Sequence, residues 1–581
     1  MKSKAFIIWG EVTFLLSKAY KNPLIFSIFG CLYPKKMHFR LLSTLFLCFF
    51  ATASLAQSHL LPTGGHISGS FQLNQNFYQR DSTIGAAGNP LYDNVLSGGE
   101  GWLNLLYASN NGFTANVRFD LFNNSNLHNP SQNYSAQGVG FWNASKEIGN
   151  GITILGGYFY DQFGSGIVYR SYEDRGLGID NSTFGFQVKG KFLHDNLYIK
   201  AFSGRQKNLF TTYNPVIKGA NAEYYVDFGP VQITPGASIV NRTLDANSIA
   251  AIVTTINSYT RLDSAGNYVD RFIPKYNAYA YSFYNTVNWG NFSLFAEYAG
   301  KTSEAIYNNV GKLTNTPGSV FFSSLNYSVK GFGATAQFKR TDHFVFRTSP
   351  NEQLLKGMIS FQPPLSKQNS LRLPARYMPA TQELGELAYE ADFFYTPKRG
   401  IKTNGNYTYI TLLNKQKIYE EISLEVEIKK SKNNFYDFGF QFMNYSLAIY
   451  RGKPLEPMLV SYIPYAEWTH RFNEKKSIRV EAQYQETKQD YGSWIFGLIE
   501  YNIAPRWSFA LSDMYNIKPN KDHASSHEQA HYYNCFVSFT EHATRLTLAY
   551  VKQVDGIVCT GGVCRYEPAF SGLKFTLNTT F

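Results

Sequence analysis

Two cysteines near the carboxyl end are the residues with the clearest chemical use. Cys559 and Cys564 flank the tetrapeptide Thr-Gly-Gly-Val, so their thiols can close a small loop. In an exported protein such a pair is expected to form a disulfide, because structural disulfides persist in oxidising compartments. A metal site is the weaker alternative, since two thiolates need further ligands and none stands beside them.

Three histidines form a second candidate cluster. His523, His527 and His531 follow i, i+4, i+8 spacing, which would align three imidazoles on one helical face and suit zinc. The segment is polar and precedes a strand expected at 532–540, however, which favours a solvated loop. We therefore predict no metal and no cofactor.

Hydrolytic chemistry would need a Ser or Asp nucleophile close to a histidine. His470 and His542 lie near expected turns, but no sequence pattern connects either one to a nucleophile. The prediction is that the protein is not an enzyme, with an enzyme at a membrane rim as the alternative.

Charged residues recur at every second position of several stretches, opposite apolar ones. If the apolar face contacts lipid, the charged face lines a lumen, where two walls of opposite sign would select solutes by charge. The alternative is that these positions are hydrated and tolerate any charge. The predicted acidic wall comprises Glu386, Glu390, Asp392, Glu421, Glu425, Glu427, Glu467 and Glu481, and the predicted basic wall comprises Arg118, Lys189, Lys191 and Lys200.

A glycine-rich segment at 163–180 concentrates charge of both signs. Its residues Arg170, Glu173, Asp174, Arg175 and Asp180 predict a loop that folds inward to constrict the lumen or to dock a partner, with an ordinary ordered loop as the alternative. Phosphate binding is not expected, because no strand-to-helix context accompanies the glycines.

All these candidates depend on a frame of strands. Residues 571–581 show the pattern: Leu573, Phe575, Leu577 and Phe581 are apolar, and the even positions are small, polar or charged. Such a period of two predicts a strand with one apolar and one wet face. A carboxyl-terminal strand of this kind is typical of a membrane barrel, in which no strand edge stays unpaired.

Composition agrees with a barrel. Aromatic residues make up 17% of the 581 residues and charged residues also 17%, against the roughly 25% charged residues of soluble domains. Beyond the amino-terminal region no run of about twenty apolar residues predicts a membrane helix.

Short turns rich in Gly, Pro, Asn or Asp alternate with longer polar connections along the chain, as expected when periplasmic turns alternate with external loops. This alternation predicts an all-β fold, a transmembrane antiparallel up-and-down β-barrel of about 24 strands (range about 20–28), with both termini periplasmic and no plug domain. The long connections are expected at 80–98, 123–137, 163–180, 242–272, 301–318 and 348–383.

The amino-terminal region carries targeting signals. Residues 37–56 combine a basic start, an apolar stretch and a small-x-small cleavage site, which predicts a signal peptide cleaved after Ala56. Residues 1–36 are then an over-extended gene start, and 57–581 form the barrel. Residues 1–56 hold seven basic residues and one acidic residue, so subtracting their +6 from +12 leaves +6 and gives no argument for nucleic-acid binding.

Three segments, 531–534, 557–570 and 164–174, resemble an uncharacterised outer-membrane barrel family of Bacteroidota, and the resemblance extends from about Gly65 to Phe581. It implies residence in outer-membrane lipid and insertion by the barrel-assembly machinery, for which the terminal Phe581 is the recognition feature. It implies no substrate.

Two main functions remain open from the sequence. One is a porin-like channel or transporter of unknown solute. The other is a scaffold that binds another envelope protein for secretion, gliding or surface assembly.

Overall fold

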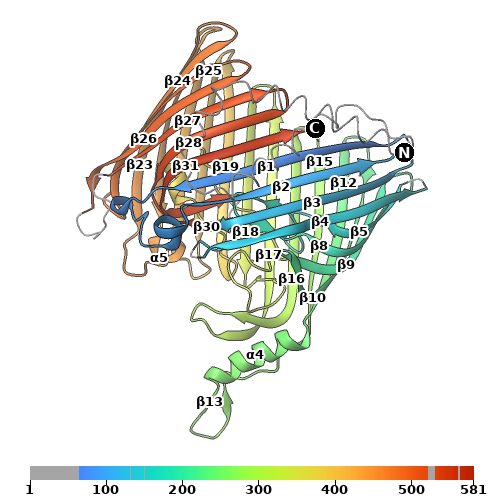
Figure 1. Ribbon diagram of the computed structural model, residues 1–581. Helices are drawn as coiled ribbons and strands as arrows, with labels where there is room; N and C mark the ends of the chain where they lie inside the picture. Colours follow the sequence, from blue (N-terminus) through green and yellow to red (C-terminus); the bar gives the residue numbers. More distant parts are fainter. Residues whose placement is uncertain (1–63, 131, 150, 521–529, 561–562) are drawn as a thin grey trace, which may run out of the picture. The chain divides into compact units, whose positions relative to one another are not determined.

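The computed structural model describes residues 64–130, 132–149, 151–520, 530–560 and 563–581, and residues Pro62–Thr580 form one compact unit. That unit is a closed antiparallel β-barrel of 24 strands, as predicted. The last strand, β31 (Phe570–Thr580), pairs with the first, β1 (His66–Tyr78), and the two lie side by side in Figure 1. Closure leaves no strand edge unpaired, which lipid requires.

The other barrel strands follow one another around the wall in chain order. They are β2 (Ser97–Ala108), β3 (Phe113–Ser125), β4 (Tyr134–Ile148), β5 (Ile152–Phe159), β8 (Thr183–Phe192), β9 (Leu197–Asn208), β10 (Thr211–Tyr224), β12 (Val231–Thr243), β15 (Asn277–Trp289), β16 (Phe292–Tyr307), β17 (Leu313–Val329), β18 (Phe332–Asp342), β19 (Gly385–Lys398), β20 (Ile401–Thr411), β21 (Lys417–Lys429), β22 (Asn434–Tyr445), β23 (Leu459–Arg471), β24 (Lys476–Gln485), β25 (Gly492–Ile503), β26 (Trp507–Pro519), β27 (His531–Glu541) and β28 (Thr544–Gln553).

Short elements occupy the connections. They are the strands β6 (Glu173–Asp174), β7 (Ile179–Asp180), β13 (Arg261–Leu262), β14 (Tyr268–Val269), β29 (Gly556–Thr560) and β30 (Val563–Glu567), and the helices η1 (Ser82–Ile84), η2 (Leu91–Val95), α4 (Ala246–Tyr259), η3 (Pro374–Tyr377) and α5 (Leu447–Tyr450). The two-residue strand β11 (Val226–Asp227) continues β10 and pairs with β12 in the barrel wall, so it is not counted as a separate strand. Within the ranges described, no helix is long and apolar enough to cross a membrane.

The two faces of the wall differ as the period of two predicts. On β21, Ile422 and Leu424 are exposed to the outside, whereas Glu421 and Ser423 on the opposite face are buried. Large exposed apolar side chains recur around the wall, among them Phe186 and Phe283. An apolar outer face of this kind is what contact with lipid tails requires.

Short turns lie at one end of the barrel and long connections at the other, as the sequence predicts. The barrel begins and ends at the end that carries the short turns, because His66 of β1 is paired with Ala108, next to the turn at 109–112. We name this the short-turn end, and the opposite one the long-loop end.

One long connection differs from the prediction. At 301–318 the strands β16 and β17 continue past the expected boundary to a short turn at 308–312, because the polar residues there remain paired across the two strands. The long connection expected at 242–272 is present, and it contains the helix α4, which together with β13 projects beyond the barrel strands (Figure 1). Asp245 caps α4 by accepting hydrogen bonds from the N–H groups of Asn247 and Ser248.

Candidate functional site

Two connections from the long-loop end contact the inner face of the barrel. The first, loop 160–182, joins β5 to β8. Arg175 donates to Gln72 Oε1 of β1 at 2.7 Å, and the backbone N–H of Ser165 donates to Glu297 Oε2 of β16 at 2.9 Å. These two strands belong to different parts of the wall, so a loop that reaches the polar face of both must cross the lumen.

Arg118 of β3 is the main anchor of loop 160–182. Only 3% of its side chain is exposed, and its guanidinium contacts Asp120 at 2.6 Å, Glu173 at 2.8 Å and Asp180 at 2.5 Å. Lys207 of β9 forms a further ion pair with Asp180. Because a buried charge is stable only when it is paired, this network holds the loop to the wall.

The remaining predicted residues of this loop have individual partners. Arg175 pairs with Glu173 at 2.8 Å and lies 4.9 Å from the ring centroid of Trp102. Asp174 accepts a hydrogen bond from the backbone N–H of Leu177 and shapes the turn between β6 and β7.

The predicted basic wall is largely paired by the same loop. Asp161 contacts Lys189 at 3.2 Å and Lys200 at 3.0 Å, in addition to the pairs that Arg118 makes. Lys191 is exposed and makes no ion pair within the described ranges. The expected field between two opposite walls stays a prediction, but most of its positive groups are already neutralised.

The second inward connection, loop 343–384, starts after β18 and reaches strands far along the wall. Lys339 of β18 donates to the carbonyl of Pro363 and pairs with Glu386 at 2.8 Å. Farther along, the N–H of Leu373 donates to Gln483 Oε1 of β24 at 2.9 Å.

The two loops also bind each other. The backbone N–H of Arg170 donates to the carbonyl of Ile359 at 2.9 Å, and that of Phe361 donates to Gly166 at 3.0 Å. The Arg170 guanidinium lies 3.9 Å from the centroid of the Phe361 ring. The barrel's own loops therefore meet inside it, while the predicted absence of a plug domain stays a prediction, since residues 1–63 lie outside the described part.

The predicted acidic wall faces the lumen on β19, β21, β23 and β24. Lys402 pairs with Glu427 at 2.9 Å, Arg479 pairs with Glu481 at 2.8 Å and with Glu467 at 3.5 Å, and Lys367 lies 3.6 Å from Glu425. On the inner face of β19 to β24, the carboxylates with no cation of the described residues within ion-pair distance are Glu390, Asp392, Glu421 and Asp437.

Asp437 on β22 is the functional candidate that the sequence prediction missed. It is paired directly opposite Glu427 on β21 and Glu467 on β23, and Glu467 is in turn opposite Glu481 on β24. A row of carboxylates thus crosses four adjacent strands. Since like charges directly opposite one another are destabilising, such a row calls for a functional explanation. Counting both strands from the turn at 430–433 would have predicted this pairing.

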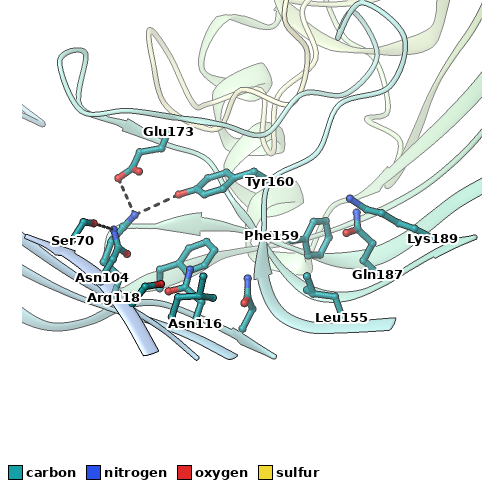
Figure 2. A pocket seen from close by; sticks show the side chains of 15 residues that line it. Ser70, Asn104, Asn116, Arg118, Leu155, Phe159, Tyr160, Glu173, Gln187 and Lys189 are labelled. Carbon is teal, nitrogen blue, oxygen red and sulfur yellow. Dashed lines mark hydrogen bonds and ion pairs between the residues drawn. The ribbon is translucent and has the colours of Figure 1, made fainter. Parts of the chain in front are cut away.

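A cavity of about 570 Å³ lies between loop 160–182 and the wall formed by β1 to β8. Figure 2 shows Arg118 directed at Glu173 and Tyr160 on one side of it, with Gln187 and Lys189 on the other. Leu155 and Phe159 are among its apolar lining residues. A second cavity of about 350 Å³ adjoins Lys367 and Asp392 of the acidic wall.

The cysteine and histidine predictions are only partly covered by the structure. Cys559 of β29 is paired in register with Cys564 of β30, but the Cys559 side chain lies outside the described atoms, so the disulfide stays a prediction. His523 and His527 also lie outside the described residues. His531 contacts Asp513 at 2.6 Å. Phe581 follows the end of β31, and its role in assembly stays a prediction.

The fold and the lumen define a transmembrane β-barrel whose interior is crossed by two of its own loops. The chain belongs to a family of unknown function (DUF6029), whose pattern matches residues 37–581. No curated protein matches the sequence. An origin in Bacteroidota stays a prediction.

Several solved structures have a similar arrangement of strands. The P pilus usher translocation pore is 9% identical, with 88% of this chain and 99% of that chain covered and a TM-score of 0.44. A mutant ferric enterobactin receptor from Pseudomonas aeruginosa is 10% identical, with 89% and 81% covered and a TM-score of 0.42. The siderophore receptor PirA from the same organism is 7% identical, with 89% and 80% covered and a TM-score of 0.40. The function therefore has to be argued from this barrel's own residues.

Proposed function

We propose that the protein is an outer-membrane channel for small hydrophilic solutes that favours cations. The closed barrel with an apolar outer face supports membrane residence, and the polar inner face supports passage of water-soluble molecules. Both termini would be periplasmic, because the barrel begins and ends at the short-turn end. The barrel-assembly machinery would insert it, and no enzymatic activity is proposed.

The row formed by Glu427, Asp437, Glu467 and Glu481 carries the proposal. Its four carboxylates form ion pairs with two cations, Lys402 and Arg479. The basic residues of the opposite wall, in contrast, are mostly paired with loop 160–182. A lumen with an unbalanced row of acidic groups on its wall attracts cations and repels anions.

Reversal potentials in planar bilayers under a KCl gradient test this function. The wild-type barrel is expected to show K⁺ preference, and the double variant Glu427→Gln/Asp437→Asn is expected to shift the reversal potential toward zero. Glu474→Gln is the matched control, because Glu474 is an exposed residue of the turn between β23 and β24. An unselective wild-type channel, or equal shifts in both variants, would contradict the proposal.

A partner-binding scaffold is the second candidate, favoured by the arm at 244–276. This arm contains α4 and the β13–β14 hairpin and exposes Tyr268 and Ile273, the latter by 87%. Replacing Tyr268 and Ile273 by Ser should abolish co-purification of a specific envelope protein from native membranes if the arm is its binding surface. Unchanged co-purification would remove the arm from consideration.

A further inference from the structure

The cavity beneath loop 160–182 contains polar groups whose hydrogen-bonding capacity is unused. Asn116 of β3 makes no side-chain hydrogen bond in the described chain, and its Oδ1 atom is buried without a partner. Asn104 of β2 donates to Ser70 Oγ only at 3.4 Å, and Asn143 of β4 uses one amide donor, toward the carbonyl of Tyr158 at 2.8 Å. Each carboxamide can offer two donors and accept at its oxygen, so a ligand has partners available here.

The charged groups around the cavity are already neutralised. Arg118 is surrounded by Asp120, Glu173 and Asp180, and Lys189 pairs with Asp161. An ionic ligand would have to break these pairs, and removing one partner of a buried pair is strongly unfavourable. A neutral ligand does not meet this cost.

The lining also includes apolar side chains that fit the carbon skeleton of such a ligand. Leu106, Leu155 and Phe159 contribute to the wall and floor, and Phe141 is stacked against Tyr160 with ring centroids 5.3 Å apart. The volume of about 570 Å³ is in the range of small-molecule sites.

We propose that this cavity binds a neutral sugar, a mono- or disaccharide. Its hydroxyl groups bond to the carboxamides of Asn104, Asn116 and Asn143, and its C–H surfaces lie against apolar side chains such as Leu155 and Phe159. A free dipeptide has the size but carries an ammonium and a carboxylate, for which the cavity has no unpaired counter-charge. This site goes beyond the proposed cation preference, which depends on the opposite wall of the lumen.

Isothermal titration of maltose and glucose into the detergent-purified full chain tests the site. At least one of the two sugars is expected to bind, and Asn116→Ala and Asn104→Ala are each expected to weaken binding by about three- to tenfold, since each removes a hydrogen bond. Asn288→Ala is the control, because Asn288 is on the inner face of β15 away from the cavity.

Heat-modifiable gel migration of each variant separates loss of the site from loss of the fold. The proposal is overturned if neither sugar binds to the folded wild type at tens of millimolar, if glycylglycine binds in their place, or if the folded asparagine variants bind as the wild type does. The reversal-potential measurement is independent of this titration, so a failure here leaves the channel function standing.

Discussion

At the scale of single residues, the geometry around Arg118 depends on an irregularity in the wall. The register between β3 and β4 shifts between Arg118 and Phe119, so that Gly140 has no partner of its own. The carboxylate of Asp120 fills the space beside Gly140, where a Cβ atom would lie 1.8 Å from Asp120 Oδ2. Bulges of this kind redirect side chains next to sites, and here the bulge allows Asp120 to reach Arg118.

The variant Gly140→Ala should therefore displace Asp120 from Arg118. We expect it to lower the free energy of unfolding by about 1–3 kcal/mol, the usual cost of forcing extra volume into a packed site. Urea unfolding in detergent measures the change. Gly497→Ala is the control, because a Cβ atom at Gly497 meets nothing within 4 Å. Equal stability of the two variants would show that the Asp120 contact matters little.

Because Asp180 holds loop 160–182 to the barrel wall, we expect the loop to be released only at acidic pH. Burial would raise the pKa of its carboxyl group, but Lys207 and Arg118 lower that pKa to about 2, below the ordinary value of 3.8. A carboxylate with a depressed pKa stabilises the folded state above its unfolded pKa, and this contribution is lost as the pH falls toward 2.

Single-channel conductance should consequently stay constant from pH 7 to about pH 4 and rise at lower pH, as the loop is released. Asp180→Asn should show the higher conductance at every pH. Circular dichroism at each pH checks that the barrel itself remains folded. A conductance change centred near neutral pH would show that another group controls the loop.

At the scale of elements, the paths of loop 160–182 and loop 343–384 through the lumen cannot be predicted from the alternation of apolar and polar residues along the strands. Each is tied to inner-face side chains of non-adjacent strands, and they are joined by backbone hydrogen bonds at Ile359 and Phe361. The strands that each loop connects hold its two ends. The inner-face residues that the loop contacts position its middle part. Loop 160–182 is therefore a part of the constriction that can be removed while the barrel strands stay in place.

Replacing residues 162–180 with a short Gly-Ser linker should raise the single-channel conductance severalfold, because the loop would no longer cross the lumen. Deleting residues 246–272 from the arm at 244–276 is the matched control, and it should leave conductance unchanged, since α4 and β13 lie beyond the barrel strands (Figure 1). If both deletions have the same effect, loop 160–182 does not limit conduction.

At the scale of the whole molecule, the barrel is closed by the pairing of β1 with β31. Asn74 is paired opposite Thr576 of β31, and Thr576 is also opposite Thr547 of β28. Residues opposite one another on adjacent strands have Cβ atoms about 4.5–5.5 Å apart, close enough for a disulfide after a small adjustment.

In a Cys535→Ser background, the pair Asn74→Cys/Thr576→Cys should therefore cross-link under oxidising conditions. The pair Asn74→Cys/Thr547→Cys should not, because two strand spacings, about 9.6 Å, separate those positions. Migration of heat-denatured protein on a non-reducing gel distinguishes a cross-linked from an open chain. Cross-linking of only the second pair would mean that the barrel closes in another register.

The sequence by itself determined the barrel. Alternation along strands such as residues 571–581, together with the order of short turns and long connections, predicts the class, the strand number and the inner-facing position of residues such as Arg118 and Glu421. These are local properties, because the side-chain period of a strand and the residues of a turn depend on neighbours in the chain.

Only the tertiary structure decided which inner-facing residues meet. Arg118 pairs with Asp180, and loop 160–182 contacts loop 343–384, although the residues that meet lie far apart in sequence. The path of a loop through a lumen is determined by charge pairing and packing across the whole barrel, and no repeating pattern in the chain records it. The helix α4 shows the same limit, because its buried residues Ile252 and Ile256 pack beside Leu313 of a distant strand.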